Sequence, residues 1–133
     1  MIMTWFTNNS DGFLSVTRTP DELSIVCSEK AYKAFAKAHG AAFAAKEQQG
    51  GWLALKVKGP LAFELVGILA NISGTLALAD VSIFALSTYN TDYVLVQADK
   101  ADAALAALNA RSDRFSVTRQ SDAKSSGNNN KKK

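Results

Sequence analysis

Seventeen consecutive residues decide the fold of this chain: Val81-Ser82-Ile83-Phe84-Ala85-Leu86-Ser87-Thr88-Tyr89-Asn90-Thr91-Asp92-Tyr93-Val94-Leu95-Val96-Gln97. Two apolar runs, 81–87 and 92–97, lie on either side of the polar segment 88–91. Polar residues of these types are typical of tight turns. Both runs are apolar on their two faces at the spacing of a strand. The stretch therefore predicts two antiparallel strands joined by a turn.

A strand and a helix are expected upstream of this hairpin. In Leu53 to Lys58 apolar and other residues alternate, which predicts a half-buried strand, and Gly59-Pro60 should end it. The region Ala62 to Ala79 predicts a helix, because its apolar residues recur at core spacing. These residues are Leu65, Leu69, Ile72 and Leu76.

A short helix and a last strand are expected downstream. Asp99 is expected to cap the helix, whose apolar face holds Ala101, Ala104, Leu105 and Leu108, and residues 115–119 follow as a strand. The order from Leu53 on is then β-α-β-β-α-β, which predicts an α+β, ferredoxin-like fold. Both helices should cover one face of an antiparallel sheet. Right-handed crossovers should place the first and third of these strands at its centre.

The N-terminal part of the chain predicts a β-hairpin and a helix. Residues 13–18 and 23–27 have strand character, and Thr19-Pro20-Asp21-Glu22 between them is turn chemistry, with Asp21 expected to bond back to the backbone. Residues 29–45 predict a helix that Gly40 should interrupt. We therefore expect residues 1–50 to be a hairpin-and-helix extension and residues 51–119 to be the main domain. The extension or a second copy of the chain should cover the otherwise bare sheet face.

The charge of the chain is concentrated at its C-terminal end. The net charge is +3, but four of the fifteen basic residues lie in the last eleven positions. Without them, eleven basic residues stand against twelve acidic ones, about −1. This balance argues against nucleic-acid binding. From Lys124 on there is no apolar residue, so residues 120–133 are expected to form a disordered basic tail.

Catalytic and metal-binding residues are scarce. His39 lacks a carboxylate or cysteine partner at helical spacing, and Cys27 ends a strand as a small apolar residue. No CxxC or HExxH spacing occurs. We therefore expect no enzyme, metal or cofactor. The first residues resemble no signal peptide and no apolar run is long enough to span a membrane, which favours a cytoplasmic protein with no membrane partner.

Two places in the chain suit a small ligand with both a negative and a positive group. A helix that starts after Gly59 would offer the free amides of Leu61, Ala62 and Phe63 to a carboxylate, with Glu64 one turn in. Thr88, Tyr89, Asn90 and Asp92 cluster at the turn. The pattern alone leaves open whether these groups form a site or only a polar turn and a solvated first-turn acid.

The chain also resembles a known family. The residues that carry the resemblance are Gly51 to Phe63, Val66 to Ala70 and, most specifically, Ser87-Thr88-Tyr89-Asn90-Thr91-Asp92-Tyr93. They are similar to ACT-domain proteins related to aspartokinase regulatory domains and CASTOR-type arginine sensors. The resemblance implies an amino-acid-binding regulatory domain, with ligand contacts at Thr88, Tyr89, Asp92 and the loop after Gly59. The alternative is a ligand-free dimerisation module. Strands that are apolar on both faces favour a homodimer, whether or not the domain binds a ligand.

Overall fold

The computed structural model describes residues 2–6, 13–40, 50–58 and 66–119. The chain divides into two units, Met1–Thr7 together with Gly51–Lys133, and Asn8–Gly50. Each unit is described by itself. The first seven residues thus go with the larger unit, whereas the sequence pattern had grouped them with the hairpin and its helix. The expected basic tail lies outside the described residues.

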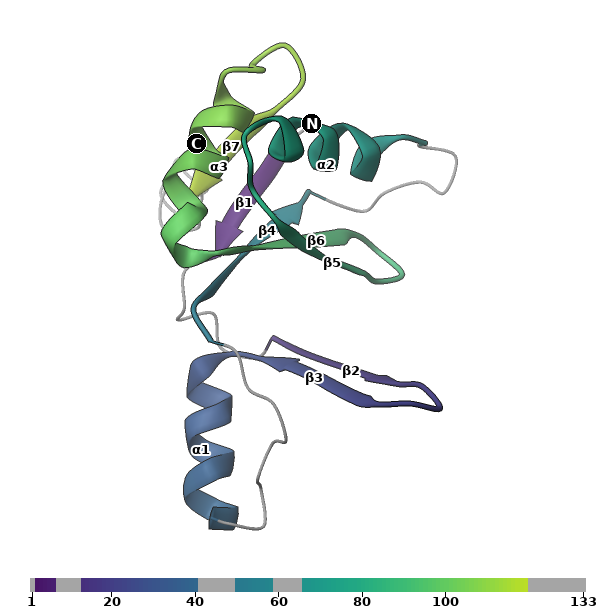
Figure 1. Ribbon diagram of the computed structural model, residues 1–133, viewed down its shortest axis with the longest axis vertical. Helices are drawn as coiled ribbons and strands as arrows, with labels where there is room; N and C mark the ends of the chain where they lie inside the picture. Colours follow the sequence, from purple (N-terminus) through teal and green to yellow (C-terminus); the bar gives the residue numbers. More distant parts are fainter. Residues whose placement is uncertain (1, 7–12, 41–49, 59–65, 120–133) are drawn as a thin grey trace, which may run out of the picture. The chain divides into compact units, whose positions relative to one another are not determined.

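The larger unit is a five-stranded sheet with its helices on one face (Figure 1). The strands occur in the spatial order β5-β6-β4-β1-β7. In chain order the elements are β1 (Ile2–Phe6), β4 (Trp52–Val57), α2 (Ile68–Leu78), β5 (Ile83–Ser87), β6 (Asp92–Gln97), the 3₁₀ turn η2 (Ala98–Lys100), α3 (Ala101–Asn109) and β7 (Ser116–Arg119). This arrangement confirms the α+β, ferredoxin-like fold. It also confirms that the first and third strands of the βαββαβ unit, β4 and β6, are neighbours.

Strand β1 was not expected from the sequence. It lies between β4 and β7, antiparallel to β4 and parallel to β7. The first and fourth strands of the βαββαβ unit are therefore separated by an N-terminal strand. The sheet is mixed at this one pairing and antiparallel at the others.

The core lies between the sheet and the two helices. The alternation predicted for 53–58 is present, because Leu55 and Val57 are fully buried against the helices. Val94 and Val96 on β6 face the same way. The apolar face predicted for α3 is confirmed, since Ala101, Ala104 and Leu108 are buried and Leu105 is half-buried. The helices contribute Ile72, Leu76 and Leu108 as the largest fully buried side chains.

Two helix starts differ from the expected ones. Helix α2 begins at Ile68 rather than Ala62, since Gly67 takes a left-handed conformation with φ 80° and Val66 before it is not helical. Asp99 does not cap a helix. It lies inside η2, and neither η2 nor α3 has a side-chain cap.

The other face of the sheet is also apolar. Leu95 is 4% exposed yet lies outside the main core cluster, as expected for the residue between Val94 and Val96 on a strand. Trp52 and Phe84 lie on this face with their rings in an edge-to-face contact, 6.4 Å between centroids. Phe84 remains 39% exposed. Strands β5 and β6 thus carry apolar residues on both faces of the sheet, as the sequence predicted.

The smaller unit contains the predicted hairpin and helix. Strands β2 (Leu14–Arg18) and β3 (Leu23–Cys27) pair antiparallel, and α1 spans Glu29–His39. The turn is closed by the Thr19 hydroxyl, which accepts from the amides of Asp21 and Glu22 at 3.3 and 3.1 Å. The Thr19 hydroxyl thus closes the turn, a role that the sequence analysis expected of the Asp21 side chain. Gly40 ends α1 with φ 51°, and the rest of the helix expected to residue 45 lies outside the described residues.

Candidate ligand-binding site

The β5–β6 turn brings four of the predicted site residues together. Thr88, Tyr89 and Asn90 occupy the turn, and Asp92 begins β6 opposite Ser87. Tyr89 projects into solvent, with 80% of its side chain exposed. Gly59, Leu61, Ala62, Phe63 and Glu64 lie outside the described residues, so the second half of the predicted site stays a prediction.

Thr88 uses its hydroxyl within the turn. Its Oγ1 donates to the carbonyl of Thr91 at 2.8 Å and accepts from the amide of Thr91 at 3.2 Å. The amide of Thr88 also donates to the Thr91 carbonyl, at 2.9 Å. A hydroxyl has one proton and two lone pairs, so Thr88 can offer a ligand only one further acceptor position.

Thr91 is a buried polar residue that the sequence analysis treated only as part of the turn. It is 5% exposed, and its hydroxyl donates to the carbonyl of Val57 at the end of β4. The bond crosses 34 positions of sequence, so no local pattern could reveal it. The only sequence signal was a threonine among the polar residues of a turn.

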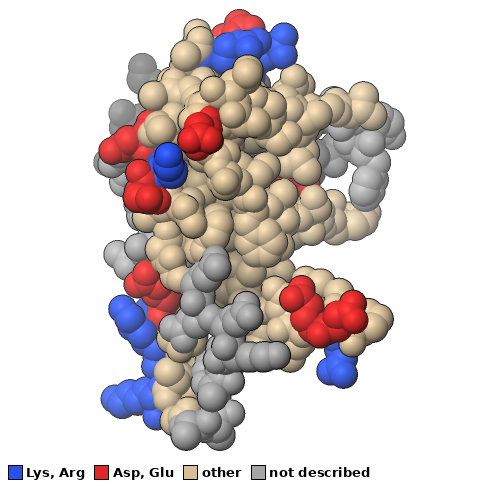
Figure 2. All heavy atoms as spheres, viewed as in Figure 1, with Lys and Arg blue, Asp and Glu red and all other residues tan. Residues whose placement is uncertain are grey.

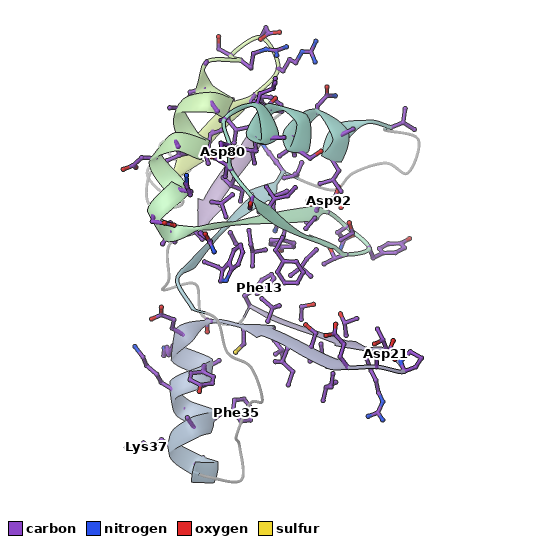
Figure 3. The ribbon with its side chains drawn as sticks, in the orientation of Figure 1. Phe13, Asp21, Phe35, Lys37, Asp80 and Asp92 are labelled. Atoms are coloured by element: carbon purple, nitrogen blue, oxygen red, sulfur yellow. The ribbon has the colours of Figure 1, made fainter. Side chains whose placement is uncertain are left out.

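Asp92 faces the helices. It precedes Tyr93 and is two positions from Val94, which is in the helix-covered core, so the alternation of a strand directs Asp92 to that side. Figure 3 shows its carboxylate between the sheet and α2. The side chain is half-buried. Within the described part of the chain, no ion pair includes it.

Lys56, a lysine on the strand next to Asp92, contacts the opposite face of the sheet. Lys56 lies opposite Tyr93 in the β4–β6 register. Its Nζ lies 5.8 Å from the centroid of the Tyr93 ring, a cation–π contact. Because Tyr93 and Asp92 project to opposite faces, this contact holds the ammonium group away from the carboxylate.

The N-terminus of α2 lies at the same end of the unit as the β5–β6 turn (Figure 1). The topology requires this, because β4 leads into the segment before α2, and β6 begins beside the end of β4. No side chain caps α2, and its first turn contains no acidic residue. Amides of the first turn have no partner within a helix, and in α2 these are the amides of Ile68, Leu69 and Ala70. The role predicted for Leu61, Ala62 and Phe63 lies outside the described residues and stays a prediction.

Across residues 2–6, 13–40, 50–58 and 66–119, no group of three or more His, Cys, Asp or Glu could hold a metal. No helix in these residues is long and apolar enough to cross a membrane. Figure 2 shows charged atoms of both signs in small separate groups on the face it displays. Among the described residues, Asp92 offers a half-buried carboxylate without an ion pair.

A family model assigns the fold. The model described as "ACT domain" matches residues 47–110, which contain β4, α2, β5, β6 and α3. Residues 47–110 are therefore similar to an ACT domain. A second family model, for an N-terminal domain, matches residues 1–32.

The relatives of the ACT domain include mammalian sensors. The protein named "Cytosolic arginine sensor for mTORC1 subunit 1" is 40% identical over 63 residues in Bos taurus and 38% identical over 63 residues in Homo sapiens. The match covers 47% of this chain and 19% of each relative. The chain therefore matches about a fifth of the length of these sensors.

Two solved structures resemble the chain. A crystal structure of an Agobacterium tumefaciens protein matches with a TM-score of 0.66 and 23% identity, covering 90% of this chain and 92% of that one. A Vibrio cholerae protein of unknown function, described as a possible transport protein, matches with a TM-score of 0.51 and 25% identity. That match covers 71% of this chain and 65% of the other. The first match shows that the fold around the ACT domain recurs over nearly the whole chain.

Proposed function

We propose that this protein is a non-catalytic sensor that binds a free amino acid in its ACT domain. The site comprises the β5–β6 turn, with Thr88, Tyr89, Asn90 and Asp92, and the segment from Gly59 to Glu64. We further propose that the protein acts in the cytoplasm as a homodimer. The ACT assignment and the names of the sensor relatives support this proposal.

The half-buried carboxylate of Asp92 is the observation that supports the proposal most directly. A half-buried carboxylate is costly unless a positive group or hydrogen-bond donors compensate it. The described residues supply no ion pair to Asp92, and Lys56 on the neighbouring strand packs on Tyr93. The ammonium group of an amino acid, or a cationic side chain, would provide the missing charge.

The N-terminus of α2 supplies the opposite pole. Its free amides and the positive end of the helix dipole favour a carboxylate. Because α2 begins at the end of the unit where the β5–β6 turn lies, a zwitterion could meet both poles at once. Glu64, Leu61, Ala62 and Phe63 remain proposed contacts in the segment between β4 and α2.

A thermal-shift screen of the proteinogenic amino acids tests the proposal. A ligand that binds only the folded state raises the melting temperature progressively with concentration. L-Arginine is the first compound to test, because the relatives are named arginine sensors. A melting temperature that no amino acid raises at about 10 mM would exclude even millimolar affinity.

The runner-up is a ligand-free dimerisation module. The apolar sheet face around Trp52, Phe84 and Leu95 favours it, because a face of this kind suits contact with another surface. In that case the polar residues of the β5–β6 turn would only shape a hairpin. A flat response to every amino acid, together with a dimer mass in light scattering, would support this module over the sensor.

A further inference from the structure

Thr91 joins two segments that are far apart in the sequence. Its hydroxyl donates to the carbonyl of Val57, the last residue of β4. Thr91 is thus bonded to the backbone at the end of β4.

The same residue organises the β5–β6 turn. The carbonyl of Thr91 accepts from both the amide and the hydroxyl of Thr88, and its own amide donates to the Thr88 hydroxyl. These bonds set the conformation of the four-residue turn. Asp92, the proposed partner of the ligand's positive group, follows directly in the chain.

Burial makes this arrangement stiff. Thr91 is 5% exposed, and no buried side-chain nitrogen or oxygen among the described residues lacks a partner. A buried hydrogen bond is hard to exchange for water, since opening it leaves a donor and a carbonyl unsatisfied. The turn is therefore tied to the end of β4 rather than attached only through its own two strands.

We propose that Thr91 is a positioning residue that fixes the β5–β6 turn, and with it Asp92, against the end of β4. This inference rests on the proposed function for its consequence in binding. Thr91 itself contacts no ligand, because its hydroxyl is bonded to Val57. Its effect on binding is exerted through Asp92.

The test compares Thr91→Val, which removes only the hydroxyl bond, with Thr91→Ser, which retains it. Thr75→Val is the matched control, because Thr75 also donates its hydroxyl to a backbone carbonyl, that of Asn71 at 2.8 Å, away from the site. The first measurement is amide hydrogen exchange of the full chain without ligand. We expect Thr91→Val to speed exchange at Thr88 and Thr91 about tenfold, with core amides changed no more than in Thr75→Val.

The second measurement is calorimetric titration with L-arginine. Thr91→Val should weaken its binding about tenfold, while Thr91→Ser and Thr75→Val should bind like the wild type. Unchanged exchange at the turn, exchange raised equally throughout the core, or unchanged L-arginine affinity in Thr91→Val would each overturn the proposal. If L-arginine fails to bind the wild type, the proposed function loses its first ligand, and the exchange data alone still decide whether Thr91 positions the turn.

Discussion

Thr88 and Thr91 are hydrogen-bonded to each other in the β5–β6 turn, and Asp92 follows them at the start of β6. The two threonines share three hydrogen bonds, and Thr91 adds a fourth to Val57. Asp92 is half-buried on the helix side of the sheet, without an ion pair among the described residues. The proposed site therefore relies on a carboxylate for which the described residues provide no ion pair.

The substitution Asp92→Asn separates a binding role from a structural one. Asparagine keeps the shape of the side chain but removes the charge, so a charge-assisted hydrogen bond to a ligand is lost. We expect the variant to fold and to bind its amino acid more weakly by roughly 1.5–3 kcal/mol. Calorimetric titration of both proteins measures this difference. A lowered melting temperature with an unchanged ligand-induced shift would instead assign Asp92 to the turn alone.

The elements of the sheet were predictable wherever the pattern was local. Strand β6 has the expected bounds, and the alternation of 53–58 gave β4, because each strand buries one set of alternate residues. The start of α2 was not predictable, since residues 62–79 have apolar spacing that suits one continuous helix. Gly67 breaks this continuity through a left-handed backbone, which a sequence pattern does not reveal. Asp99 likewise lies in a 3₁₀ turn that precedes α3.

Gly67 gives a test at the level of this helix. Its φ of 80° is unfavourable for a residue with a Cβ, whereas the nearest atom to an added Cβ, on Asn71, is at an ordinary 3.9 Å. The cost of Gly67→Ala should therefore be conformational, about 1–2 kcal/mol of the free energy of unfolding.

Gly74→Ala is the control within the same helix. It has open space around it and should stabilise by roughly 0.5–1 kcal/mol. Denaturant unfolding measures both, and equal effects of the two variants would refute this account of the α2 start.

At the scale of the whole molecule, the N-terminal strand β1 could not be predicted from the sequence. Strand β1 is five residues long and pairs with β4 and β7, which begin about 50 and 110 positions later in the chain. No local repeat or turn marks such a pairing. The candidate site was predictable at the turn, where its residues are adjacent in sequence. The bond between Thr91 and Val57 was not, because it depends on the register of β6 against β4.

The position of β1 inside the sheet predicts that the larger unit depends on it. Thr4 lies opposite Lys56 on β4 and Thr118 on β7, and proline there would remove an amide and strain the pairing. We expect Thr4→Pro to destabilise the larger unit by about 3 kcal/mol or more. Both tryptophans, Trp5 and Trp52, belong to this unit, so their fluorescence reports its unfolding. Thr17→Pro, in the separate two-stranded sheet, is the control and should leave the tryptophan transition in place. A Thr4→Pro transition like that of the wild type would show that β1 is dispensable.

The central claim is that the ACT domain binds a free amino acid between the β5–β6 turn and the start of α2. Backbone amide NMR of the ¹⁵N-labelled chain, titrated with each proteinogenic amino acid, tests it most directly. The account predicts saturable shifts for at least one amino acid, concentrated at residues 88–93 and 66–70, and reduced in Asp92→Asn. Spectra that no amino acid changes at about 10 mM, or saturable shifts confined to residues away from both segments, would contradict it.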